Sequence, residues 1–374
     1  MKKFSVHPEI CECATIKEFV ESFQLNEDDL MLINKFTYHD FMQDLALPCQ
    51  CIFYEDYTQG EPSDAVVTHM LQDIKDKKMK RVIGIGGGSV LDTAKLLCIK
   101  DAVSADDIYE DKIPFIRDKG LILIPTTCGT GCEMTCVSVI DRPKHNAKMG
   151  KRIECNFADH AVEIPELLSK IPHSVFAFSA IDALVHSMEI YVNPLSGTYN
   201  KVFCVEAIRL LIKNFKFVAE NGPESKFDVM DEFLLASSYA GIALSNDICG
   251  AVHACAMQFG GQHHVSHGEA NYRFLVPVFS VYADLNPKGR EINALAGIIQ
   301  RQMGIETDLA GTFVALDEML NKITPRKKLR EYGVDGERLM DYVTKVYATQ
   351  QRLLIANYVK MTEKEFVEIY RRAY

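Results

Sequence analysis

The sequence has little of several features that would place it in a specialised class of protein. It has no tryptophan, and acidic residues outnumber basic ones to give a formal net charge of −10. Nucleic acids and membrane surfaces are bound through clustered Lys and Arg, so this charge argues against both as partners. No apolar run reaches the ~18 residues of a membrane-spanning helix, and the opening stretch MKKFSVHPEICECATIKEFV lacks the long apolar segment of a secretion signal. We therefore expect a cytoplasmic protein.

The 12 cysteines show none of the spacings that would give them a shared task. No CxxC pair occurs among them, so a zinc ribbon, a thioredoxin-type redox pair and an iron–sulfur frame are all unsupported. We interpret them as small apolar or surface thiols in a reducing compartment.

The character of the chain changes near residue 165. Before it, short apolar runs such as RVIGIGGGS and GLILIPTT alternate with segments of helical periodicity, which is typical of a parallel sheet with helical crossovers. After it the strand signal nearly vanishes, and segments such as FSAIDALVHSMEIYV are long and helix-periodic. The sequence predicts an α/β nucleotide-binding domain with a parallel sheet over residues 1–168 and an all-α domain over residues 169–374.

A glycine-rich turn joins a predicted strand to a predicted helix in RVIGIGGGSVLDTAKLL. Adjacent glycines let a backbone approach a pyrophosphate, and the helix N-terminus offers free N–H groups. The turn departs from the GxGxxG fingerprint, because Ser89 stands at the sixth position, and it lacks the GK[ST] ending of a P-loop. A tight connection without a ligand therefore stays open as an alternative. A second polar loop, PTTCGTGCEMT, follows the strand GLILI, where open α/β sheets bind ligands.

Four residues in the second half form a possible metal site. Asp182 and His186 are four apart and would share one helix face, and His253 and His267 follow later in the chain. One carboxylate and three imidazoles suit a divalent transition metal such as Fe²⁺, Zn²⁺ or Mn²⁺. The chain has 11 His, so spacing alone does not decide between a metal site and coincidence. Glu189 we interpret as an ordinary helix carboxylate.

Taken together, these motifs resemble a known family. GGGSVLDTAK, PTTCGTGCEMT, IDALVHSMEIYV and GAVHACAMQFGGQHHVSHGEAN occur in the order of the signature segments of the iron-containing alcohol dehydrogenases, and the resemblance covers essentially the whole chain. It implies a dehydroquinate synthase-like fold and hydride transfer between a nicotinamide and a primary alcohol or aldehyde. Other stretches, among them HVSHGEANY and QQRLLIANY, resemble the members that interconvert 4-hydroxybutyrate and succinate semialdehyde.

The resemblance also implies roles for individual residues. Asp182, His186, His253 and His267 would bind the metal, Fe²⁺ or in some members Zn²⁺, as a Lewis acid for the substrate oxygen. The cofactor, NAD with NADP possible, would be bound by a larger set: Asn34, Gly86, Gly87, Gly88, Ser89, Asp92, Thr126, Thr127, Thr130 and Lys148. His264 and His267 are the candidate catalytic residues.

Three positions depart from the family pattern. Met257 stands where many members carry a second histidine, so a proton would have to move through water, a cofactor hydroxyl or His264. Cys132 replaces the serine of a GTGSE motif, a change that we expect to be neutral. Asn34 stands where some members carry an Asp that disfavours NADP, which leaves the cofactor preference open.

Alternatives remain at this point. Enzymes with the same fold act on other alcohols, diols or glycerol, which gives one alternative function. A non-catalytic nucleotide- or metal-binding protein is another. A carboxylate substrate would need a cation, for which Arg273, Lys148 and Arg352 are equal candidates. The family resemblance further implies a homo-oligomer, such as a dimer.

Overall fold

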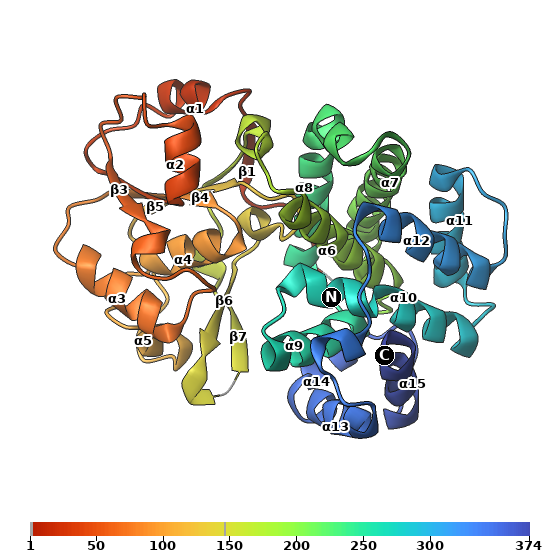
Figure 1. Ribbon diagram of the computed structural model, residues 1–374. Helices are drawn as coiled ribbons and strands as arrows, with labels where there is room; N and C mark the ends of the chain where they lie inside the picture. The colour runs from red at the N-terminus through yellow and green to blue at the C-terminus, as the bar shows by residue number, and fades with distance from the viewer. Residues whose placement is uncertain (1–2, 146) are drawn as a thin grey trace. The chain divides into compact units, whose positions relative to one another are not determined.

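The computed structural model describes residues 3–145 and 147–374, and the chain divides into two compact units (Figure 1). The first unit is Val6–Ile171. The second is Pro172–Tyr374 together with residues 3–5 at the start of the described chain. The short 3-10 turn Pro165–Leu168 precedes the break between them.

A six-stranded, wholly parallel sheet forms the first unit, with the spatial order β1-β8-β5-β4-β2-β3. The strands are β1 (Glu9–Glu12), β2 (Asp29–Ile33), β3 (Gln50–Phe53), β4 (Arg81–Gly86), β5 (Gly120–Pro125) and β8 (His160–Glu163). Five helices belong to this unit: α1 (Ile16–Ser22), α2 (Lys35–Phe41), α3 (Asp64–Ile74), α4 (Gly88–Leu97) and α5 (Ala105–Tyr109). An antiparallel pair, β6 (Val137–Arg142) and β7 (Ala147–Arg152), completes it.

The central strands are continuous apolar runs because helices cover a parallel sheet on both faces. Leu30, Met31, Leu32 and Ile33 of β2 are all fully buried. Gly84 of β4 brings the following helix close, since a Cβ at this position would lie 2.7 Å from the Cβ of Ala94 on α4. This close packing holds α4 against β4, and the glycine turn connects the two.

The second unit contains helices and 3-10 turns and no strand among its described residues. Its helices are α6 (His173–Val192), α7 (Thr198–Asn221), α8 (Met230–Asn246), α9 (Ala251–His263), α10 (His267–Leu285), α11 (Arg290–Met303), α12 (Leu309–Ile323), α13 (Leu339–Thr349), α14 (Gln351–Leu354) and α15 (Glu363–Ala373). The predicted fold class, an α/β domain with a parallel sheet followed by an all-α domain, is confirmed.

Helix α6 is the centre of the second unit. By length and composition it is the one helix in the described part of the chain that could cross a membrane, yet 78% of its apolar window is buried inside the protein. It also carries three buried ionisable residues, Asp182, His186 and Glu189. These properties are those of the core helix of a globular unit, and its polar residues mark where the site lies.

Candidate metal centre and cofactor-binding edge

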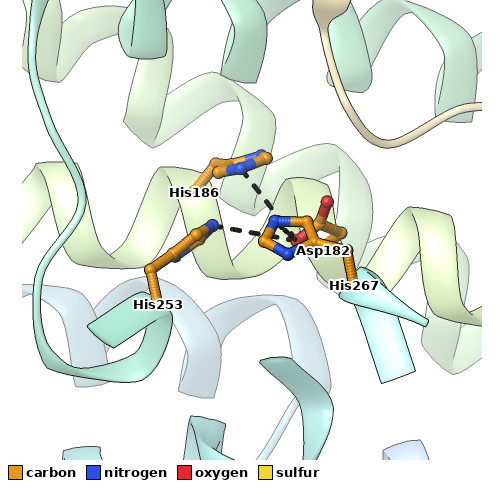
Figure 2. A group of neighbouring side chains, drawn as sticks. All are labelled: Asp182, His186, His253 and His267. Carbon is orange, nitrogen blue, oxygen red and sulfur yellow. Dashed lines mark ion pairs between the residues drawn. The ribbon is translucent and has the colours of Figure 1, made fainter. Parts of the chain in front are cut away.

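Three helices bring the four predicted ligands together in the second unit (Figure 2). Asp182 and His186 lie one turn apart on α6, His253 is near the start of α9, and His267 is the first residue of α10. The Nε2 atoms of His186 and His253 each lie 4.0 Å from Asp182 Oδ1, and that of His267 lies 3.8 Å away. One donor atom from each of the four residues falls within 4.8 Å of the others.

The cluster is buried on the α6 and α9 sides and opens at His267. The side chain of Asp182 is 2% exposed, whereas that of His267 is 41% exposed. Burial alone would raise the pKa of Asp182, but the three imidazoles and an amide hydrogen bond hold it below its ordinary value. The aspartate is therefore an anion at neutral pH, facing three nitrogen donors.

Asn271, one turn after His267 on α10, points its amide nitrogen into this cluster. Its Nδ2 donates to Asp182 Oδ1 at 2.6 Å and lies 3.2 Å from the Nε2 atoms of both His253 and His267. An amide nitrogen only donates and carries two hydrogens, so with one given to Asp182 the second can reach only one of the two Nε2 lone pairs at a time. Those are the same lone pairs that a metal ion would use.

Glu189 supports His253 from behind. Its Oε2 lies 2.7 Å from His253 Nδ1, and its Oε1 accepts a 2.7 Å hydrogen bond from the backbone N–H of Val252. An ionised carboxylate only accepts, so Nδ1 carries the hydrogen and Nε2 is left as the donor atom toward the cluster. Carboxylate–histidine pairs of this kind orient metal-bound histidines.

The charge around His253 favours a positive group. Burial by itself lowers the pKa of His253, but contacts with Cys249 and Glu189 more than offset this, and the pKa lies well above its ordinary value. The same surroundings stabilise positive charge at this position, whether it is a proton or a cation.

Sequence reasoning misjudged Glu189, which is not an ordinary helix carboxylate. A usable signal was present, because Asp182, His186 and Glu189 are spaced i, i+4 and i+7 and fall within about 60° of one another around the helix axis. Three nitrogens and one carboxylate oxygen, held in this way, fit a divalent transition metal.

Neither His264 nor Met257 belongs to the cluster of four. His264 caps the end of α9 in the left-handed conformation, with φ of 53°, and its side chain is exposed. Met257 lies one turn after His253 on α9 and is half-buried. The predicted proton transfer by His264 stays a prediction, while His267 joins the cluster at its exposed side.

In the first unit, the predicted glycine turn and threonine loop meet at the carboxyl edge of the sheet. Gly86 ends β4 and Gly87 precedes the first residue of α4, Gly88. The backbone N–H of Thr126 donates to Gly86 O at 3.0 Å. A Cβ at Gly87 would meet Thr127 at 3.5 Å, and one at Gly88 would meet Thr130 at 3.2 Å. The two loops therefore form one edge, with the start of α4 between them.

Two of the predicted cofactor residues, Asp92 and Lys148, form ion pairs inside the protein. Asp92 is buried; its Oδ1 lies 2.8 Å from the thiol of Cys132 and its Oδ2 accepts from Val139 N at 2.9 Å. Buried Lys95 completes this network, with Nζ 3.3 Å from Asp92 Oδ1. Lys148 on β7 pairs with Glu61 at 2.5 Å. The structure thus gives Asp92 the task of joining α4 to β6, and cofactor contacts by Asp92 and Lys148 stay predictions.

The three cations considered for a substrate carboxylate have different surroundings. Arg352 on α14 is exposed, and Lys148 is ion-paired. Arg273 is buried, pairs with Glu269 at 3.3 Å and lies against the rings of Phe178 and Tyr332. It leaves α10 about 200° around the axis from Asn271, away from the face that carries the cluster. Arg273 therefore does not belong to the cluster of four, and binding of a substrate carboxylate by any of the three cations stays a prediction.

Comparison with known proteins agrees with this geometry. Residues 12–165 match the family described as "Iron-containing alcohol dehydrogenase", and residues 176–374 match "Fe-containing alcohol dehydrogenase family, C-terminal". The chain is 37% identical to a 4-hydroxybutyrate dehydrogenase of Clostridium kluyveri, with 100% of both chains covered. It is 32% identical to a long-chain-alcohol dehydrogenase of Geobacillus thermodenitrificans, over 80% of this chain and 76% of the relative.

Solved structures share the fold at lower sequence identity. An alcohol dehydrogenase from Oenococcus oeni superposes with a TM-score of 0.84 at 20% identity, covering 100% of both chains. A sulfoacetaldehyde reductase from Bifidobacterium kashiwanohense, in complex with NAD⁺, superposes with a TM-score of 0.83 at 22% identity, covering 100% of this chain and 98% of the other. The chain belongs to the iron-containing alcohol dehydrogenase family.

Proposed function

We propose that this enzyme is an NAD-linked, metal-dependent alcohol dehydrogenase that interconverts 4-hydroxybutyrate and succinate semialdehyde. The proposed substrate rests on the 37% identity to the Clostridium kluyveri enzyme, which extends over the whole of both chains. The observation that supports the chemistry is the convergence of one carboxylate and three imidazoles on one point.

Asp182, His186, His253 and His267 would hold the ion, Fe²⁺ by family and Zn²⁺ as the other possibility. A divalent ion there acts as a Lewis acid toward the substrate oxygen. The protein side chains do the positioning: Glu189 keeps the hydrogen of His253 on Nδ1, and Asn271 holds Asp182 through a 2.6 Å hydrogen bond. Because these contacts exist before substrate arrives, the ligands need little rearrangement during the reaction.

The cofactor would lie along the carboxyl edge of the sheet. Gly86, Gly87 and Gly88 leave the backbone open to a pyrophosphate, and Ser89 lies in the first turn of α4, whose N-terminal N–H groups favour an anion. Thr126, Thr127 and Thr130 supply hydroxyls from the neighbouring loop. NAD is the proposed cofactor, with NADP as the alternative.

The remaining parts of the proposal concern the setting of the enzyme. A cytoplasmic location is supported by the 12 cysteines, all of which are free thiols. Assembly into a homo-oligomer, a dimer at least, is proposed from the family and is checked by light scattering of the purified chain.

The test is reduction of succinate semialdehyde, followed by loss of NADH or NADPH absorbance, anaerobically, with Fe²⁺ or Zn²⁺ returned to metal-stripped protein. We expect metal-dependent turnover that is faster than with propanal or butanal. Turnover with the uncharged aldehydes alone would keep the family reaction and reject the substrate. No turnover with either metal and either cofactor would contradict an enzymatic role and direct attention to Met257.

A further inference from the structure

At the end of β3, the carboxylate of Glu55 lies beside Asn34, the position at which some family members carry an Asp. Glu55 lies in the 3-10 turn Tyr54–Asp56 that follows β3. Its Oε1 accepts from Asn34 Nδ2 at 3.0 Å, and its Oε2 accepts from the backbone N–H of Lys35 at 2.9 Å. Two hydrogen bonds therefore hold this half-buried side chain at a fixed place.

That place is next to the glycine turn. Strand β2 lies between β3 and β4 in the sheet, with Ile33 paired to both Phe53 and Ile85, so the residues that follow the three strands share one edge. A Cβ on Gly86 would lie 2.9 Å from Asn34 Oδ1. Asn34 thus touches the glycine turn with its oxygen and Glu55 with its nitrogen, and Glu55 lies one side chain farther along the edge.

The carboxylate of Glu55 has spare acceptor sites and no ion-paired Lys or Arg among the described residues. Lys35, whose backbone N–H contacts Glu55, forms its side-chain ion pair with Asp56 rather than with Glu55. Within residues 3–145 and 147–374 no Lys or Arg is ion-paired with Glu55. A carboxylate accepts about four hydrogen bonds, and the two protein donors leave room for the hydroxyls of a ribose. In dinucleotide-binding sheets an Asp or Glu beyond the pyrophosphate turn hydrogen-bonds the ribose 2′-hydroxyl, and here Glu55 follows β3, one strand beyond β2 in the sheet.

We infer that Glu55 is the residue that selects NAD over NADP in this chain, in place of the acid that position 34 lacks. Its charge repels a 2′-phosphate, while its free acceptor sites receive the ribose hydroxyls. Asn34 acts as a positioning residue, because its amide fixes the Glu55 carboxylate without adding charge. This inference rests on the proposed nicotinamide cofactor.

The experiment is a binding titration with the full chain in the presence of a chelator, so that catalysis plays no part. NADH and NADPH are added separately, and the rise in dihydronicotinamide fluorescence on binding gives each dissociation constant. The protein has no tryptophan, which removes the strongest competing emission. Wild-type protein is expected to bind NADH at least about tenfold more tightly than NADPH, because like charges in contact are strongly unfavourable.

Glu55→Gln is the test variant, since it removes the charge with little change in shape. Glu27→Gln is its matched control: Glu27 is exposed at the amino end of β2, roughly 15–20 Å along the strand and beyond the screening length of physiological salt. Glu55→Gln should lower the NADPH/NADH ratio of dissociation constants by about tenfold, and Glu27→Gln should leave it unchanged. Glu55→Asp, which keeps the charge, should stay closer to the wild-type ratio than Glu55→Gln.

The outcomes separate this inference from the proposed function. Wild-type protein that binds neither nucleotide would overturn the proposed cofactor, and the role of Glu55 with it. Wild-type protein that binds both nucleotides equally well would overturn the role of Glu55 alone, even if Glu55→Gln did not fold. An unchanged ratio in a folded Glu55→Gln variant would have the same meaning.

Discussion

Replacing Glu189 by Gln tests whether the metal centre depends on the residue behind it. Glu189 is buried and accepts from His253 Nδ1 and from the backbone N–H of Val252, each with a donor–acceptor distance of 2.7 Å, and from the backbone N–H of His253 at 3.4 Å. Gln offers one acceptor and one donor in the same space. If its oxygen accepts from His253, its NH₂ group faces the Val252 N–H. If its oxygen accepts from Val252, its NH₂ group donates to Nδ1 and moves the imidazole hydrogen to Nε2, where the metal should bind.

Either arrangement weakens the site by an amount that can be measured. Loss of an outer carboxylate typically costs 10–100-fold in metal affinity, which corresponds to about 1.4–2.7 kcal/mol. An unsatisfied buried donor costs a further ~1–3 kcal/mol of folding free energy. We expect Glu189→Gln to bind Zn²⁺ or Co²⁺ with 10–100-fold lower affinity in competition with a chromophoric chelator, and to unfold at lower urea concentration.

The matched control is Glu269→Gln. Glu269 is on α10, two residues from His267, but its side chain contacts Arg273 and Tyr332 rather than a ligand. Its replacement should leave metal affinity within about twofold, well inside the change expected from a lost outer-shell carboxylate. Metal affinity at the wild-type level in Glu189→Gln would refute the view that this carboxylate orients His253.

Four further predictions use other parts of the structure. His267→Ala should abolish turnover while nucleotide fluorescence titrations stay unchanged; full activity with metal bound would reject the ligand assignment. Gly87→Ala should weaken NADH binding without loss of stability in thermal unfolding, because the φ of Gly87 is −74° and a Cβ there meets no atom closer than 3.5 Å. Gly86→Ala should instead destabilise the protein, since its Cβ would lie 2.6 Å from Val90. Lys95→Met should cost about 3–5 kcal/mol in urea unfolding, because it leaves buried Asp92 without its cation; a loss below about 1 kcal/mol would contradict this. Burial raises the pKa of Cys98 to about 12, above its unfolded value of about 8.5. The stabilising contribution of the Cys98 thiol is therefore complete below pH ~8.5 and is lost as pH rises toward 12. Cys98→Ala should lose less unfolding free energy than wild type over that interval, and an equal loss would argue against the raised pKa of Cys98.

The sequence predicted those parts of the fold whose signal is local. Strands β2 to β5 are fully or largely apolar runs because both faces of a parallel sheet are buried, and the metal ligands on α6 follow helical spacing. Strands β1 and β8, with sequences EICE and HAVE, carry too few apolar residues to stand out. The segment GERLMDYVTKVYATQQRLLIANY is helix-periodic in sequence, yet its helical part is divided at Gln350, where the backbone leaves helical geometry with ψ of 22°.

The contacts of the supporting residues could not be predicted, because their partners are distant in the chain. Glu189 and His253 are 64 positions apart, and Asn34 and Glu55 are 21 apart. Helical spacing places Glu189 on the same face of α6 as Asp182 and His186, but the local sequence does not identify its partner. Nothing comparable marks Glu55. Only the packing of α6 and α9 against α10, and of β3 beside β2, turns these two acids into parts of a site.

The four ligands come from three helices, α6, α9 and α10. A bound ion would therefore affect the stability of the helical unit as well as the reaction. An ion held there ties residue 182 to residue 267 and closes the long stretch of chain between them, much as a covalent cross-link would. Its binding free energy then adds to the resistance of the whole helical unit to opening. Because proteases cleave the opened form, we expect the lifetime of this chain in the cell, and not only its activity, to follow the supply of metal.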